Sequence, residues 1–258
     1  MGTVCACTGR LNQEVAPNTA ELPTVVAATA AAQREPAPPR REPDPVSRAS
    51  LLPDDARVDW DANAVMRILG RIAKNPTQTE YWRGGARVDE RRGTYAFDCS
   101  GMVEWVLHKA APTAAYASAQ SLGRRPLAID FYHWIASVSP ERDRHGWRRV
   151  TRVEDAEPGD VIAWIKPPIV PSPNTGHVAF VVFKPARVPG RDDAFVVRIA
   201  DSSSLLHEDD TRIDRNGFGL GTVLVLADGA TGAPTGYGWV GLRAWTFETP
   251  IAIGRPLH

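Results

Sequence analysis

The sequence contains very little cysteine. Two of its three cysteines, Cys5 and Cys7, lie at the extreme N-terminus of a chain of 258 residues. Three cysteines cannot form a disulfide framework, so the fold must be stabilised by its hydrophobic core. Cys5 and Cys7 are too close together for a usual structural zinc pair and have no matching pair downstream. Cys99 is therefore the cysteine that calls for a chemical explanation.

The chain also lacks an excess of charge and long apolar runs. Its 30 basic residues balance its 30 acidic residues, so there is no electrostatic reason to expect nucleic acid or an anionic membrane as a partner. No apolar run approaches the length of a membrane span. The short apolar run 25–32 follows Glu14 and Glu21, with only Arg10 as a basic residue. That is a poor start for a signal peptide.

Composition divides the chain near residue 50. Residues 1–50 are rich in Ala, Pro, Glu and Arg and contain few large apolar side chains. Such a segment cannot bury enough apolar surface to offset its chain entropy, which predicts a disordered tail or a proline-stiffened linker. Residues 51–258 are long enough for one sizeable folded domain.

Helical patterns come first in that domain and strand patterns follow. Asp61 or Asn63 can cap a helix whose apolar positions recur at helical spacing, and residues 100–109 form a second amphipathic segment. Weaker helical patterns are found at 115–122 and 129–138. Strand patterns follow at 161–165, 178–183, 195–200, 223–226 and 238–245. The links between the strands are too short for helical crossovers. The order predicts an α+β fold with an antiparallel sheet.

Cys99 stands where the second helix is expected to begin. The unpaired N–H groups and the positive dipole end of a helix N-terminus favour a thiolate, which is the nucleophilic form of cysteine. The position therefore suits nucleophilic catalysis. The alternative is a buried cysteine that packs as a small hydrophobic side chain.

A cysteine nucleophile needs a general base, and the base needs an orienting partner. His177 opens an apolar strand directly after Gly176, and glycine allows close approach of a neighbouring backbone. In an antiparallel sheet the next strand ends beside it, so Asp201 is placed to accept a hydrogen bond from His177. Asp201 could instead cap loop N–H groups, and Ser202 and His207 are alternative third members. The other histidines are less well placed: His108, His133, His145 and His258.

Four short motifs occur in order along the chain, at Tyr81–Gly85, Phe97–Val103, Glu157–Val161 and Gly176–Val181. Together they resemble the NlpC-type family of papain-like cysteine peptidases, which cut bacterial cell-wall peptides. The resemblance covers roughly residues 60–205. It implies a papain-like fold, in which helices, one with the nucleophile at its N-terminus, pack on an antiparallel sheet.

The resemblance also implies roles for individual residues. Cys99 would attack the amide carbonyl, His177 would act as base and then as acid, and Asp201 would be the third, polar residue, which is more often histidine in the family. Tyr81 would line the site. Asp98 and Ser100 match positions that hold the free amine of the substrate peptide in related enzymes. No metal or other cofactor is needed, because the triad supplies both nucleophile and base.

The implied substrate is a peptidoglycan stem peptide, usually cut between γ-D-glutamate and diaminopimelate or lysine. Such a monomeric enzyme would be secreted, periplasmic or wall-associated, although the weak signal leaves the cytoplasm open. The intervals from Cys99 to His177 and from His177 to Asp201 look longer than a minimal family member needs, with the excess in residues 111–150, 166–175 and 184–194. Segments of this kind border the substrate groove, which leaves the peptide specificity open. Two alternatives remain: a papain-like amidase or acyltransferase acting elsewhere, such as an interbacterial toxin or a lysin, and an inactive binding module.

Overall fold

The computed structural model describes residues 58–120, 122, 124–212, 216–239 and 245–257. All of them belong to the unit formed by residues 41–258. The tail predicted for residues 1–50 lies outside the described residues and stays a prediction. Among the helices that the structure describes, none is both long and apolar enough to cross a membrane.

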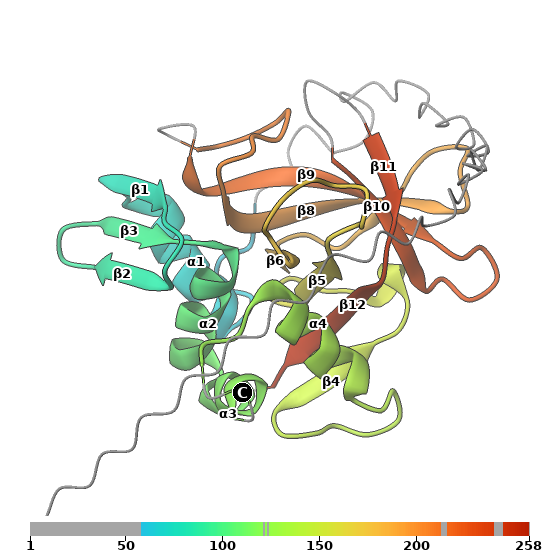
Figure 1. Cartoon of the computed structure of the whole chain (residues 1–258), viewed down its shortest axis with the longest axis horizontal. Coiled ribbons are helices and arrows are strands. Elements are labelled where there is room, and N and C mark those ends of the chain that lie inside the picture. Colours follow the sequence, from blue (N-terminus) through green and yellow to red (C-terminus); the bar gives the residue numbers. More distant parts are fainter. Residues whose placement is uncertain (1–57, 121, 123, 213–215, 240–244, 258) are drawn as a thin grey trace, which may run out of the picture. The chain divides into compact units, whose positions relative to one another are not determined.

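The first half of the described chain carries the α-helices (Figure 1): α1 (Ala64–Lys74), α2 (Cys99–Ala110), α3 (Pro112–Ala119) and α4 (Ala128–Ser137). Of the two caps expected for α1, Asn63 is the one used, since its side-chain oxygen accepts a hydrogen bond from the N–H of Met66 at 3.0 Å. α3 begins earlier than the expected residue 115. Pro112 lies in its first turn, where a missing N–H has no cost because those N–H groups have no helical acceptor.

A small sheet between α1 and α2 was not predicted. Its strands are β1 (Gln78–Tyr81), β2 (Ala86–Asp89) and β3 (Thr94–Phe97). β3 lies in the middle, parallel to β1 and antiparallel to β2, and runs directly into α2. Each strand has four residues, which is too short for an alternating apolar pattern to stand out.

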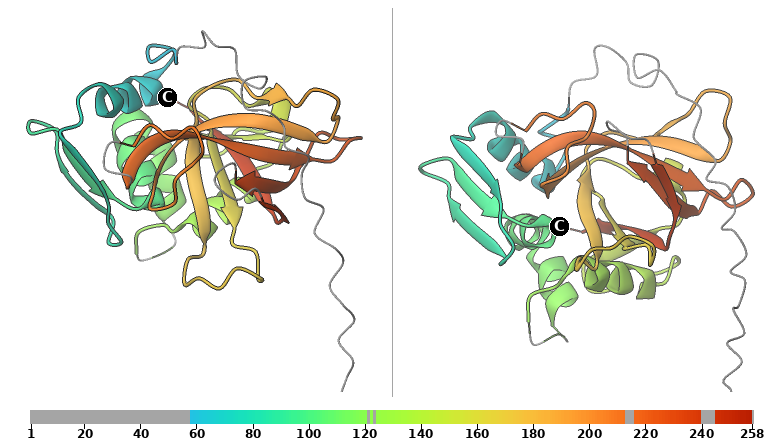
Figure 2. Two further views of the ribbon diagram at one scale, coloured as in Figure 1. Left: turned by 90° about the horizontal axis from the view of Figure 1, so that it is seen from above. Right: turned by 45° about the horizontal axis from the view of Figure 1, so that its top comes forward.

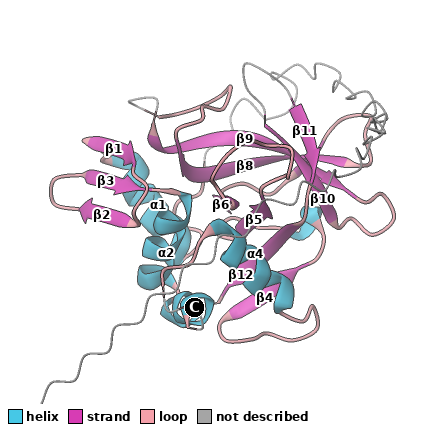
Figure 3. Cartoon of the chain, viewed as in Figure 1, coloured by secondary structure: helices cyan, strands magenta, loops and turns pink. Residues whose placement is uncertain are grey.

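The rest of the described chain forms a nine-stranded sheet. Its strands, drawn in magenta in Figure 3, are β4 (Trp147–Val150), β5 (Val161–Ile165), β6 (Gly176–Val181), β7 (Ala186–Arg187), β8 (Ala194–Ser203), β9 (Gly217–Ala227), β10 (Pro234–Trp239), β11 (Trp245–Glu248) and β12 (Ile251–Pro256). They follow the order β11-β10-β9-β8-β6-β5-β12-β4, with β7 beside β8, and every pair is antiparallel. The expected α+β class with an antiparallel sheet is confirmed.

The strand boundaries differ from the expected ones in an informative way. β5 coincides with the prediction, but β8 continues through Ser203, beyond the expected strand end at residue 200. β9 begins at Gly217, well before the expected residue 223. The two extensions pair with each other, down to Ser203 opposite Gly217. Asp and Gly, which occur in these extensions, have low strand propensity, so only the pairing reveals these segments as strands.

Both faces of the large sheet are buried, which explains its continuous apolar runs. Val161 and Ala163 of β5 belong to a core shared with the helices, whereas Ile162 and Trp164 belong to a second core on the opposite face. α2 and α4 pack on the first of these faces, against β5, β6, β8 and β12 (Figure 2). The start of α2 is thereby held beside the central strands.

The turn after β1 is packed directly against the first turn of α2. Gly85, in this turn, has a φ of 104°, a backbone conformation that glycine adopts without steric cost. A Cβ atom on Gly101 would lie 2.2 Å from the carbonyl oxygen of Gly85. The contact is with backbone atoms of Gly85, so a larger residue at position 101 would fit only if α2 or the Gly85 turn moved.

Gly101→Ala should therefore destabilise the protein, because the methyl group would push α2 away from the Gly85 turn. We expect the free energy of unfolding, measured by urea denaturation, to fall by about 1–3 kcal/mol. Gly229→Ala is the matched control, since nothing lies within 4 Å of its Cβ position. Equal stabilities of the two variants would contradict the close packing.

Candidate active site

Cys99 is the first residue of α2. It belongs to the buried core, and 8% of its surface is exposed. The helix is capped by Asp98, whose carboxylate accepts a hydrogen bond from the N–H of Gly101 at 2.7 Å. The helix thus begins one residue before the expected Ser100. The N–H of Cys99 belongs to the first turn, whose N–H groups have no acceptor within the helix.

His177 and Asp201 form a hydrogen bond between neighbouring strands. Nε2 of His177 donates to Oδ2 of Asp201 at 2.7 Å, and the imidazole also hydrogen-bonds the side chain of Cys99. Because Asp201 engages Nε2, Nδ1 is the nitrogen that remains for the sulfur. The structure thus brings Cys99, His177 and Asp201 together, in the order that a nucleophile, base and orienting group require.

The imidazole is confined by its neighbours in the sheet. Trp164 lies opposite His177 in the β5–β6 pair, and the two ring centroids are 5.0 Å apart. The ring of Trp164 also contacts the ring of Tyr237, and these two ring centroids are 4.8 Å apart. A Cβ atom on Gly176 would lie 1.9 Å from the carbonyl oxygen of Trp164, so the glycine before His177 does permit a close backbone approach.

Opposite charges set the protonation states of the site. Burial acts to lower the pKa of His177, but the charge of Cys99 and hydrogen bonds to Asp201 and Cys99 outweigh it and raise the pKa to about 10. Burial acts to raise the pKa of Asp201, yet the Arg212 charge and the histidine hydrogen bonds hold it well below its usual range. At neutral pH His177 is therefore an imidazolium, the kind of neighbour that favours a cysteine thiolate.

Arg212, which sequence reasoning missed, holds the other side of Asp201. Its side chain is fully buried, and Nη2 donates to Oδ1 of Asp201 while Nη1 donates to Asp210. Nε donates to the carbonyl oxygen of Gly217 at 2.8 Å. Both carboxylate oxygens of Asp201 are therefore engaged, one by Arg212 and one by His177.

The glycines of β9 make room for this arrangement. A Cβ atom on Gly219 would lie 2.4 Å from the Arg212 side chain, and one on Gly221 would lie 2.1 Å from the His207 ring. The alternating glycines at 217, 219 and 221 were the sequence feature that could have indicated the close packing around Arg212. They mark one face of a strand against which other chain segments lie closely.

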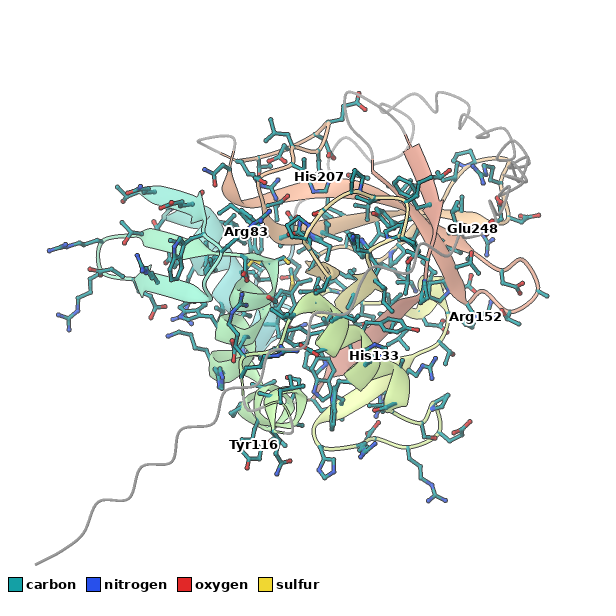
Figure 4. All side chains as sticks on the ribbon, in the orientation of Figure 1. Arg83, Tyr116, His133, Arg152, His207 and Glu248 are labelled. Carbon is teal, nitrogen blue, oxygen red and sulfur yellow. The ribbon has the colours of Figure 1, made fainter. Side chains whose placement is uncertain are left out.

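The alternative third residues, Ser202 and His207, make contacts with backbone carbonyl groups, and His207 also contacts Asp201. The hydroxyl of Ser202 donates to the carbonyl oxygen of Phe97 at 2.6 Å, which ties β8 to the end of β3. Nδ1 of His207 lies 3.2 Å from the carbonyl oxygen of Thr222, and its Nε2 lies 3.7 Å from Oδ1 of Asp201. His207 thus lies beside β9 (Figure 4), and its Nε2 is near Oδ1 of Asp201, the oxygen that Arg212 also contacts.

The remaining histidines lie apart from the triad. His108 is in the last turn of α2 and pairs with Glu104 at 3.8 Å. His133, on α4 in Figure 4, and His145 are exposed. His258 lies outside the described residues.

Tyr81 lies at the end of β1, close to the nucleophile. Burial raises the pKa of its phenol, the charges of Cys99 and Asp98 add to this, and a hydrogen bond from Arg83 opposes it. Its backbone N–H donates to the side-chain oxygen of Asn216. Asn216 directly precedes β9, so the start of β9 positions Tyr81.

Asp98 and Ser100 are paired with a residue of this chain, Arg125. Its Nη2 donates to Oδ2 of Asp98 at 2.5 Å, and its Nη1 donates to Oδ1 of Asp98 at 3.1 Å and to the Ser100 hydroxyl at 2.8 Å. This differs from the free substrate amine that the resemblance implies at these two residues. Arg125 was missed because it lies between two helical patterns and carries no signal of its own.

Within the part of the chain that the structure describes, no group of three or more His, Cys, Asp or Glu side chains could hold a metal ion. Comparison with protein-family models gave no match, and neither the curated proteins nor the solved structures gave a significant one. The geometry of the site therefore carries the functional assignment.

Asp201→Asn should lower the pKa of His177 from about 10, because the amide removes a negative charge next to the imidazolium. We expect a decrease of roughly one unit or more, measured by NMR titration of the ring. Since the pKa of His177 is raised in the folded protein, its contribution to stability is complete below about 6.5 and is lost as the pH rises toward about 10. In the variant that loss should move to lower pH. Asp143→Asn, on an exposed ion pair, should change neither quantity.

Arg212→Met should reduce the free energy of unfolding by about 3–5 kcal/mol near neutral pH, because it leaves two carboxylates without their buried cation. The pKa of Asp201 is lowered in the folded parent, so its contribution is present above its ordinary pKa of 3.8 and is lost as the pH falls. Urea denaturation should therefore show a smaller difference at acidic pH. Arg152→Met, which removes a partly exposed pair with Glu154, should cost at most about 1 kcal/mol.

Proposed function

We propose that this chain is a cysteine amidohydrolase of the NlpC-type, papain-like family. Its proposed substrates are peptide bonds of bacterial peptidoglycan stem peptides, of the γ-D-glutamyl–diaminopimelate type. The observation that carries the proposal is the contact of Cys99, at the start of a helix, with a strand histidine whose other nitrogen is held by a buried carboxylate. The packing of α2 on β6 and β8 supports the papain-like assignment. Location in the periplasm or cell wall is part of the same proposal.

In the proposed mechanism the Cys99 thiolate attacks the amide carbonyl carbon. The carbonyl oxygen becomes an oxyanion, and the N–H of Cys99 at the helix N-terminus is placed to donate to it. The His177 imidazolium gives its proton to the leaving amine, the carbon–nitrogen bond breaks, and a thioester remains on Cys99. Neutral His177 then removes a proton from water, which attacks the thioester and releases the carboxylic acid and the thiolate.

A second candidate is a papain-like amidase or acyltransferase that acts on another amide. The observation that favours it is Arg125, which pairs with both Asp98 and Ser100. The inactive binding module loses support, because Asp201 faces His177 and keeps it charged.

Digestion of purified peptidoglycan and soluble stem peptides, read by mass spectrometry, tests the proposal. The parent should produce a new diaminopimelate-side amine, and Cys99→Ala should produce none, because the thioester cannot form. His177→Ala should reduce the rate at least about 100-fold. His133→Ala is the matched control, since this histidine is exposed on α4. A product that Cys99→Ala also makes, or no product from the parent, would refute the proposal.

A further inference from the structure

The pairing of Arg125 with Asp98 and Ser100 bears on the kind of substrate that the site accepts. We propose that Arg125 fills the position of a substrate α-amine, so that the acyl half of the substrate carries a blocked N-terminus. A stem peptide still joined through its N-terminus to a glycan strand has this chemistry. The inference rests on the proposed function and gives it a substrate class.

The carboxylate of Asp98 accepts four hydrogen bonds from groups of this chain. Oδ1 accepts from the Ser100 hydroxyl at 3.1 Å, from the Gly101 N–H at 2.7 Å and from Nη1 of Arg125 at 3.1 Å, and Oδ2 accepts from Nη2 at 2.5 Å. A carboxylate has about four lone-pair sites. Three of the four donors crowd Oδ1, so an incoming ammonium group would have to displace a donor there or share Oδ2 with the guanidinium.

Ser100 is engaged in the same way. Its single hydroxyl proton goes to Asp98, and its oxygen accepts from Nη1 of Arg125 at 2.8 Å. Asp98 and Ser100 are only 6% and 3% exposed, respectively. The guanidinium thus covers both residues and already supplies the positive charge that an ammonium group would bring.

Arg125 itself belongs to the wall of the site. It lies in the link between α3 and α4, and its Cδ is 3.5 Å from the Cβ position of Gly85 in the turn after β1. Gly85 in turn packs on Gly101 of α2. With 28% of its side chain exposed, Arg125 can meet a substrate, and a second cation beside it would be repelled.

The direct test compares a soluble stem peptide that has a free N-terminal amine with its N-acetyl form. The parent should cleave the N-acetyl peptide with a kcat/KM roughly ten-fold or more above that of the free amine. Arg125→Gln should narrow or reverse this ratio of kcat/KM values, because the guanidinium no longer offsets the negative charge of the Asp98 carboxylate. Arg124→Gln, in the same link but paired with Asp130, should keep the parent ratio. A parent that prefers the free amine would overturn the inference.

A second measurement decides the inference even if the parent cleaves neither peptide, a result that would refute the proposed function. Cys99 is treated with two methanethiosulfonate reagents, one sulfonate-bearing and one trimethylammonium-bearing. In each reaction the thiolate attacks the sulfenyl sulfur, a disulfide forms and methanesulfinate leaves. In Arg125→Gln the ratio of rates should shift several-fold, by roughly a factor of 3–10, toward the cationic reagent.

Arg125→Lys keeps the charge and should keep the parent ratio of reagent rates, which separates an effect of charge from a loss of packing. Arg124→Gln should also leave the ratio unchanged. If Arg125→Gln shifts the ratio of reagent rates no more than Arg124→Gln does, the Arg125 guanidinium does not set the electrostatic potential near Cys99. The inference would then be wrong.

Discussion

The buried carboxylate of Asp201 is the constraint on which the rest of the site depends. It is completely inaccessible, with Arg212 on one oxygen and His177 on the other. An ionised carboxylate inside a protein costs several kcal/mol in lost hydration unless cations and hydrogen bonds offset that loss. Arg212, in the described part of the link that follows β8, supplies such a cation and packs against Gly219 of β9. Glycine is needed at positions 219 and 221 of β9, because a Cβ atom there would collide with the side chains of Arg212 and His207.

This dependence explains which parts could be predicted from sequence. Cys99 was found because a helix start has local signals, and the strand of His177 was found because its residues are continuously apolar. Asp201 was found because short links force consecutive strands to pair, so the end of one lies beside the start of the other. In each case the information lay within a few residues, or followed from chain connectivity alone.

The parts that were missed depend on partners distant in sequence. β12 pairs with β4 and β5 from the far end of the chain, and β1 to β3 are too short to carry a period. Arg212, Arg125 and Asn216 look like ordinary polar loop residues until the fold brings them to Asp201, Asp98 and Tyr81. Sequence patterning reports burial, and a charged side chain buried by its ion pair breaks that pattern.

The ion pairs also decide how His177 works. The pKa of Asp201 is held well below its usual range, so the carboxylate stays ionised, and its effect is to orient the ring and keep it positively charged. A pKa of about 10 for His177 means that the ring is protonated before any substrate arrives. In the proposed reaction, the proton that His177 carries is then the one donated to the leaving amine. The base function of His177 is confined to the second half, when water attacks the thioester.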